Sequence, residues 1–460
     1  MTKSSKLTLL AFSAFAFSMP AYANTLMEVY RLAEDNDPQF RIADSERRAT
    51  MELYPQARSF LMPSVSARGL YADNQGNGFG VDTKFYSFTL TLTQPLFNGA
   101  LWSGFRQADA RIRQSEINYA VAQQDLMIRV ASRYFDVLAA KDSLDFARTT
   151  KSAIHRQLDQ SKQRFEVGLI AITDVQESQA GYDLAVADEI LAQNQLNTAY
   201  EALREITGQY SQTLVGLKEE IELVSPEPAN IDEWANTALD NNPQLLASRL
   251  DVEIAREEVK RQRAGHYPTL DLNGQYEYSH TEQDGGNMFF NRSGYNETYG
   301  ASVQLNVPIF QGGRVVSQTR EAKIRHVQSL DRLEQQHRAI QRQARDTYLN
   351  VLAGISRVQA LGQAVVSSKT AYEATETGFE VGTRTSVDVL NSQRDLLRAQ
   401  RDYARSRYDY ILNMLRLKQA SGQLVVEDLA KLERWFNEPV VQEGPQKTGN
   451  PVATPLPVGD

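Results

Sequence analysis

The chain contains an internal duplication. The sequence YFDVL at residues 134–138 recurs 214 positions later as YLNVL at 348–352, and FEVG at 165–168 recurs at the same offset. Nearer the N-terminus, the offset between matching residues is 205. A duplication of this length predicts two similar structural units that pack with pseudo-symmetry. We therefore expect a first structural repeat at 24–229 and a second at 230–436.

The N-terminus predicts export from the cytoplasm. Lys3 and Lys6 precede an apolar run at 7–17, and Ala-Tyr-Ala follows at 21–23. This order of charged, apolar and small residues is typical of a secretory signal peptide, which we assign to 1–23. The apolar run is too short to cross a bilayer as a helix. No later stretch has about 18 consecutive apolar residues, so no transmembrane helix is expected.

Composition excludes several classes of protein. The predicted signal peptide carries two lysines and no acidic residue, so its removal takes the formal net charge from −8 to −10. This balance gives no electrostatic reason to bind nucleic acid. The chain has no cysteine, and therefore no disulfide, thiolate metal site or cysteine-linked lipid anchor. The C-terminal segment 437–460 is rich in glycine and proline and is predicted to be disordered.

Residues that could carry catalysis form no recognisable pattern. The five histidines lack the spacing of metal ligands, and no nucleophile motif lies in a strand–turn–helix context. These histidines are His155, His266, His280, His326 and His337. We expect no cofactor and no enzyme activity, and a secreted enzyme is only the third of three functional alternatives.

Four segments alternate apolar and polar residues, at 65–71, 86–93, 270–278 and 299–307. A period of two places the two sets on opposite faces of a sheet, one apolar with aromatic residues near its ends and one polar. Any one of these strands would also suit a soluble antiparallel sheet. Four of them, paired as two hairpins in an exported chain without a membrane helix, favour insertion into the outer membrane.

Four strands cannot close a membrane barrel, because single-chain barrels begin at about eight strands. An open sheet edge in lipid leaves backbone groups unpaired, at a cost of several kcal/mol each. Several chains would therefore share one barrel, of eight strands in a dimer or twelve in a trimer. The hairpin loops, predicted at 73–84 and 280–297, are rich in glycine and asparagine and fit solvent-facing tips.

The rest of the chain predicts long helices. From about 101 to 165 no proline interrupts the sequence, and apolar residues recur at spacings of 3, 4 or 7. The second copy repeats this pattern at about 314–379. Such helices would be about 100 Å long, which favours a coiled-coil-like assembly. A filamentous coiled coil would show the same pattern, but it explains neither the four strands nor the signal peptide.

Each long helix is predicted to end at a sharp turn. Gly168 and Gly382 suit the left-handed residue that follows a helix C-terminus. The next helices should run to about Thr207 and Ala420, each ended by a nearby glycine. The two turns would then lie at the same end of the molecule, opposite the strand hairpins.

The helices after these turns carry capping signals. Thr173 with Gln176 fits a capping box, and Thr385 with Asp388 fits a related cap. An aspartate in the first helical turn also interacts favourably with the helix dipole, by about 0.3–1 kcal/mol.

The turn segments resemble those of the TolC family of outer-membrane efflux ducts. The resemblance is carried by FEVGLIAITDVQ at 165–176 and VGTRTSVDVL at 381–390, with LREITG at 203–208 and PLFNG at 95–99. It covers about 24–435, including both repeats. It implies a mixed fold in which a homotrimer shares a twelve-stranded transmembrane β-barrel, four strands from each chain. The long α-helices would form a coiled-coil tunnel in the periplasm, with a mixed girdle around its middle.

The resemblance also implies a gate at the turn end. Arg384 would pair with Asp174 and the Thr173 region to hold the tunnel closed. Asp388 would form a threefold ring at the narrowest point. The alternative for both aspartates is a simple capping role.

Two positions depart from the family pattern. Phe379 stands where the family commonly has a latch tyrosine, so a hydroxyl hydrogen bond is missing. Asn391 stands where a second ring aspartate is expected, so the ring should be less negative. Both departures concern the strength of closure.

The sequence therefore predicts a passive trimeric channel-tunnel in the cell outer membrane, in contact with its lipid. It would export small molecules, proteins or both, in tripartite efflux or type I secretion. Energy would come from an inner-membrane transporter, reached through a periplasmic adaptor. By resemblance, the adaptor would dock at six turn residues, Val167, Gly168, Leu169, Val381, Gly382 and Thr383. The second alternative is a non-conducting structural coiled-coil protein of the envelope.

Overall fold

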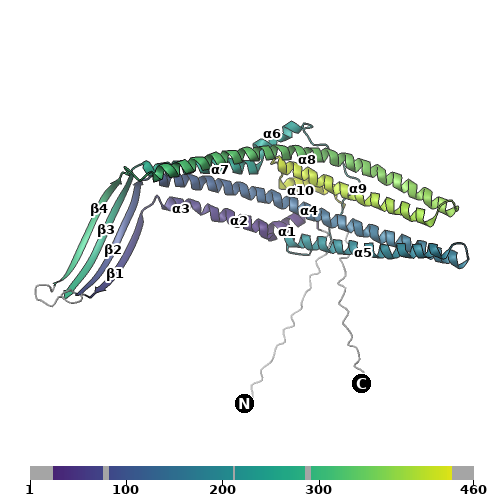
Figure 1. The fold of residues 1–460 in the computed structure, drawn as a ribbon, viewed down its shortest axis with the longest axis horizontal. Coiled ribbons are helices and arrows are strands. Elements are labelled where there is room, and N and C mark those ends of the chain that lie inside the picture. The colour runs from purple at the N-terminus through teal and green to yellow at the C-terminus, as the bar shows by residue number, and fades with distance from the viewer. Residues whose placement is uncertain (1–23, 76–81, 211–212, 285–291, 438–460) are drawn as a thin grey trace, which may run out of the picture.

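The computed structural model describes residues 24–75, 82–210, 213–284 and 292–437. The predicted signal peptide lies outside these residues, as does all of the predicted C-terminal tail except Asn437. The described residues form an elongated molecule with a sheet at one end and long helices that run to the other (Figure 1).

The first half of the chain follows the predicted order of helix, strand hairpin, long helix, turn and helix. Its elements are α1 (Leu26–Asn36), α2 (Pro38–Met51), α3 (Leu53–Ser59), β1 (Ser64–Asn74), β2 (Asp82–Phe97), α4 (Gly99–Glu166) and α5 (Ile172–Thr207). The side chain of Asn98 caps α4 by accepting from the N–H groups of Ala100 and Leu101. The helix therefore starts two residues before the predicted position.

The second half repeats this order and adds a short helix. Its elements are α6 (Ile231–Asn241), α7 (Pro243–Arg263), β3 (Thr269–Asp284), β4 (Arg292–Asn306), α8 (Arg314–Glu380), α9 (Ser386–Ala420) and α10 (Val426–Leu432). Short 3-10 helices lie at Ala264–His266 and Glu433–Trp435. The bounds of α8 and the ends of α5 and α9 match the predictions to within one residue. The two turns lie at the same end, opposite the sheet (Figure 1).

One proline accounts for a difference between the two halves. Pro55 lacks the N–H that would donate to the carbonyl of Met51, and α2 ends at that residue. Lys260 occupies the equivalent position in the second half, and α7 runs without a break from Pro243 to Arg263.

The duplicated Asn-x-Pro-Gln motif caps a helix in both copies, but its buried polar group differs. Asp37 accepts from the N–H of Phe40 and also binds the guanidinium of Arg129, with Nη2–Oδ2 at 2.6 Å. Asn242 caps α7 in the same way and instead donates to the carbonyl of Ala420 at 2.9 Å. The first copy thus anchors its helix to α4 through an ion pair, and the second anchors its helix to α9 through a neutral hydrogen bond.

The four strands form one antiparallel sheet in the order β1-β2-β3-β4. The strands extend further toward the tips than the alternation indicated, so the predicted loops at 73–84 and 280–297 are too long. Asp73 pairs with Lys84, and Glu282 with Ser293. The backbone ladder continues here because it needs no apolar side chains, whereas the sequence pattern ended with them. The tips themselves, 76–81 and 285–291, lie outside the described residues.

A row of aromatic rings crosses one face of the sheet near its tips. Tyr71, Tyr86, His280 and Tyr295 are direct cross-strand neighbours. Successive ring centroids are 5.1, 5.9 and 4.2 Å apart. The register therefore brings Tyr71 and Tyr86, from the predicted strands, to one level with His280 and Tyr295, which the sequence had placed in a loop.

The main hydrophobic core lies half-way along the helices. Phe135 of α4 stacks against Tyr408 of α9 and against Phe436, with ring centroids 5.5 and 6.1 Å apart. The hydroxyl of Tyr134 donates to the carbonyl of Val215 at 2.8 Å and fixes the segment that follows α5. Asn437, predicted to begin the tail, bonds to the backbone of this same segment. Asn437 is therefore part of the folded segment rather than of the predicted tail.

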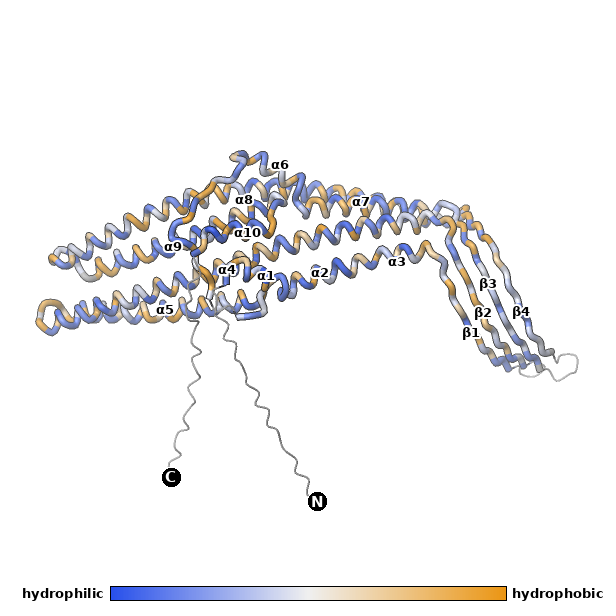
Figure 2. Tube along the Cα trace, turned by 180° about the vertical axis from the view of Figure 1, so that it is seen from behind, coloured by the Kyte–Doolittle hydropathy of each residue, from blue (hydrophilic) through white to orange (hydrophobic). Residues whose placement is uncertain are grey.

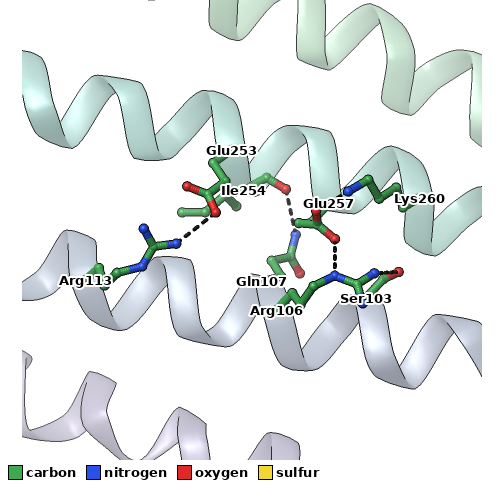
Figure 3. A network of polar contacts seen from close by, with 8 residues as sticks. All are labelled: Ser103, Arg106, Gln107, Arg113, Glu253, Ile254, Glu257 and Lys260. Atoms are coloured by element: carbon green, nitrogen blue, oxygen red, sulfur yellow. Dashed lines mark hydrogen bonds and ion pairs between the residues drawn. The ribbon is translucent and has the colours of Figure 1, made fainter.

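A polar network joins the two repeats between this core and the sheet (Figure 3). The carboxylate of Glu257 on α7 accepts from Arg106 of α4 at 2.8 Å and from Lys260 at 2.6 Å. Its side chain is 4% exposed, whereas each cation is 49% exposed. Burial acts to raise the pKa of Glu257, but the hydrogen bonds from Lys260 and Arg106 hold it below its usual range. Glu257 therefore remains a charged anchor between the helices.

The network continues along both helices on either side of this anchor. Gln107 donates to the carbonyl of Ile254 at 3.3 Å, and Arg113 donates to Glu253 at 2.8 Å (Figure 3). Since α4 follows β2 and α7 precedes β3, these bonds hold together the two helices from which the middle of the sheet extends.

Hydrophobic and hydrophilic residues alternate along the long helices (Figure 2). None of the helices in the described part of the chain combines the length and the apolar content that a membrane crossing requires.

Candidate functional site

The candidate site is the end of the two helical hairpins, α4–α5 and α8–α9. In the first turn, Gly168 has φ +76° and the N–H of Leu169 donates to the carbonyl of Arg164 at 2.8 Å. In the second turn, Gly382 has φ +77°, and the equivalent bond is also 2.8 Å long. These are glycine C-caps of the predicted kind, in which a left-handed residue turns the chain so that the N–H of the next residue donates to a carbonyl in the last turn of the helix.

Both turns expose apolar side chains at their tips. Val167 is 70% exposed, Leu169 73% and Val381 71%. The other three predicted docking residues, Gly168, Gly382 and Thr383, are exposed as well. The two tips lie at the same end of the protomer, so all six residues are exposed at that end (Figure 1).

The predicted capping box of Thr173 and Gln176 is wrong. Helix α5 begins at Ile172, and Ala171 is its N-cap. The carboxylate of Asp174 accepts from the N–H of Ala171 at 3.3 Å, and this bond sets the start of the helix. Thr173 lies in the first helical turn with its side chain exposed.

The predicted cap of the second hairpin is confirmed. The N–H of Thr385 donates to Oδ2 of Asp388 at 3.0 Å, and the N–H of Asp388 donates back to the Thr385 hydroxyl at 3.2 Å. The backbone and side-chain hydrogen bonds from Thr385, together with the nearby charge of Arg384, lower the pKa of Asp388. Asp388 is therefore ionised at neutral pH. Asn391 lies three residues further along α9 with its side chain exposed.

The side chain of Arg384, in the turn between α8 and α9, folds back over the end of α8. A Cβ at Gly378 would lie 2.8 Å from Cγ of Arg384, so any larger residue there would force this side chain to move. Within the described residues of one protomer, Arg384 forms no ion pair with Asp174, which lies on the other hairpin. The pairing of these two residues stays a prediction for the assembled protein.

Phe379 has a partner that the sequence did not predict. The guanidinium carbon of Arg164 lies 4.5 Å from the centroid of the Phe379 ring, so α4 contacts α8 at the hairpin end. The duplication marked Arg164 as unusual, because the equivalent residue of the second copy is Gly378, which has no side chain.

The model of the family described as "Outer membrane efflux protein" matches the chain twice, at residues 29–209 and 234–423. The chain belongs to the outer membrane efflux protein family. It is 39% identical over 414 residues to the outer membrane protein TolC of Vibrio cholerae, which covers 90% of this chain and 94% of that protein. It is 31% identical to the alkaline protease secretion protein AprF of Pseudomonas aeruginosa, over 81% of this chain and 79% of that protein. The predicted resemblance to the TolC family is therefore confirmed.

The fold agrees with this assignment. The crystal structure of the CmeC outer membrane channel of Campylobacter jejuni superposes with a TM-score of 0.74, at 16% identity, over 94% of this chain and 97% of that one. As a member of the outer membrane efflux protein family, the chain is an export duct of the outer membrane. One of these relatives is named as an outer membrane protein and the other as a secretion protein, and neither is named as an enzyme.

Proposed function

We propose that three copies of this chain close into one passive duct. Each copy would give four strands to a twelve-stranded barrel in the outer membrane, and its helices would extend the duct into the periplasm. The number three comes from the family resemblance. The need for several copies is supported by the chain itself, because β1 and β4 are the edges of a sheet that a single copy leaves open.

The observation that carries this proposal is that the two edges of a protomer differ and are both apolar. Ile309 and Phe310, which follow β4, are 94% and 86% exposed. On the same side, α8 exposes Val316, Ile324 and Val327 on one face.

The opposite side of the protomer is formed by α2, α3 and β1 (Figure 1). It exposes Ile42, Phe60, Met62 and Val65. An interface between two different surfaces repeats head to tail, and it ends only when the ring closes. We infer that each protomer buries its β4–α8 side against the α2–α3–β1 side of the next.

The hairpin end is proposed as the gate of this duct. In a ring, three copies of Asp388 would face one axis, where their carboxylates would favour cations. Arg384 would reach Asp174 and the Thr173 region of a neighbouring copy, because these residues are not paired within one protomer. Phe379 and Asn391 would close the duct with one hydroxyl and one carboxylate fewer than the family pattern.

The exposed tips are proposed as the docking surface for a periplasmic adaptor. The six residues 167–169 and 381–383 include three apolar side chains that are at least 70% exposed. Exposed apolar clusters of this kind mark interaction sites. The adaptor would connect the duct to an inner-membrane transporter that supplies the energy, so the duct itself would catalyse no reaction. Because the relatives include a protease secretion protein, we propose that cargo includes proteins as well as small molecules.

Single-channel recording in a planar bilayer tests the proposal. The purified protein is expected to be a trimer by light scattering and to conduct ions through a small, mostly closed pore. Arg384→Ser should increase the conductance. A trimer that never conducts, in either form, would support the alternative of a structural envelope protein and refute the duct.

A further inference from the structure

The two hairpin ends of one protomer are joined by a contact between Arg164 and Phe379. Arg164 lies in the last turn of α4, and Phe379 is the penultimate residue of α8. The guanidinium carbon is 4.5 Å from the ring centroid, within the range in which the ring quadrupole attracts a cation. Both side chains are half-buried, so water screens the contact only in part.

Nothing else in the described residues competes for this arginine. They place no carboxylate within ion-pair distance of Arg164, whereas many other arginines of the long helices are paired. The ring is therefore the partner of the charge. Because Phe379 has no hydroxyl, it offers the arginine only its face.

The duplication does not provide an equivalent contact in the opposite direction, from the second repeat to the first. Arg164 corresponds to Gly378, and Ile170 corresponds to Arg384. Each turn thus carries one arginine, at different positions. In the second turn, the missing side chain at Gly378 leaves room for Arg384 to fold over the end of α8. In the first turn, Arg164 extends from that same position to the other hairpin.

We propose that Arg164 and Phe379 form a clamp that holds the two hairpin ends of each protomer together in the closed duct. The clamp rests on the proposed gate. Any opening that moves the α8–α9 end away from the α4–α5 end must separate the guanidinium from the ring. The clamp replaces a hydroxyl hydrogen bond, which Phe379 cannot form.

Two kinds of variant test the clamp by single-channel recording. Arg164→Ala and Phe379→Leu each remove one partner and are expected to raise the ratio of open to closed channel by about two- to fivefold per protomer, the range for a partly exposed cation–π contact. The double variant should have no larger effect than either single variant, because both remove the same contact. Phe379→Tyr keeps the ring and restores the hydroxyl of the family pattern, so this ratio should not rise.

Phe165→Leu is the matched control. Phe165 is the equivalent phenylalanine of the first repeat, is exposed, and has no ring contact among the described residues. Its replacement should leave opening unchanged. Equal effects of the two phenylalanine variants, or additive effects of Arg164→Ala and Phe379→Leu, would overturn the clamp.

A distance measurement separates the clamp from the proposed function. Because the chain has no cysteine, spin labels can be placed at Val167→Cys and Val381→Cys alone. Co-assembly with excess unlabelled chain isolates the distance within one protomer. Arg164→Ala and Phe379→Leu are expected to broaden this distance toward longer values, and Phe165→Leu is not. An unchanged distance in conducting channels would refute the clamp and leave the duct intact. Absence of conductance in every form would refute the duct, and the distances would still decide the clamp.

Discussion

Replacement of Glu257 with glutamine is expected to weaken the junction between α4 and α7. The variant keeps the shape of the side chain but removes the charge that Arg106 and Lys260 contact at 2.8 and 2.6 Å. Loss of one partner from a fully buried ion pair costs about 3–5 kcal/mol. Here both cations are half exposed and can return to water, so we expect a loss of about 2–3 kcal/mol in the free energy of unfolding.

Glu253→Gln is the control for this prediction. Glu253 lies one turn away on α7 and binds Arg113 of α4 at 2.8 Å, but its side chain is 35% exposed. Ion pairs of this exposure contribute less than about 1 kcal/mol. Urea unfolding followed by far-UV circular dichroism, at equal protein concentration, gives both values. Equal losses in the two variants would refute the argument from burial.

The pH dependence gives an independent check on the charge. The pKa of Glu257 is lower in the folded protein than its ordinary value of 4.5. Its contribution to stability is therefore complete above that value and is lost as the pH falls through the folded pKa. The difference between wild type and Glu257→Gln should be constant from neutral pH to about pH 5 and should shrink below about pH 4.5. A difference that does not change with pH would show that the charge is not its source.

Three further predictions concern the sheet, the gate and the end of α9. Leu90→Arg with Leu92→Arg places two charges on the apolar face of β2, at about 2–4 kcal/mol each near the bilayer midplane, so the protein should be lost from the membrane fraction. Normal insertion would contradict the assignment of that face to lipid. Asp388→Asn should abolish most of the cation selectivity, measured as reversal potentials in a salt gradient, and unchanged potentials would remove Asp388 from the constriction. Gly422→Ala should lower the thermal midpoint strongly, because a Cβ there would collide with the carbonyl oxygen of Asn241. Gly312→Ala, also at positive φ but in open space, should lower the midpoint less.

Much of the fold could be predicted from the sequence because it follows local rules. The existence and length of α4 and α8 follow from an uninterrupted 3.6-residue pattern, and the turns follow from Gly168 and Gly382 at positive φ. The failures were also local. At the start of α5, two acceptors lie one residue apart. The carboxylate of Asp174, rather than the Thr173 hydroxyl, forms the hydrogen bond that caps the helix.

The residues that lie at the hairpin ends were predicted only in part. The resemblance identified Phe379, Arg384 and Asp388, and the structure places all three at the hairpin ends. It did not identify Arg164, because a charge near a helix C-terminus is equally well explained by the helix dipole. The comparison of Arg164 with Gly378 in the second copy was the available signal.

The sequence by itself determined the two repeats, the four strands, the long helices and their turns. Each of these depends on residues a few positions apart, whose spacing fixes which side of an element they occupy. Only the tertiary structure decided that Arg106 contacts Glu257, that Arg164 contacts Phe379, and that Asp37 and Asn242 bind different partners. These residues are far apart in the chain, and periodicity within one helix carries no information about the rotation of the helix packed against it. Those contacts are fixed by how the helices pack around the core at Phe135 and Tyr408.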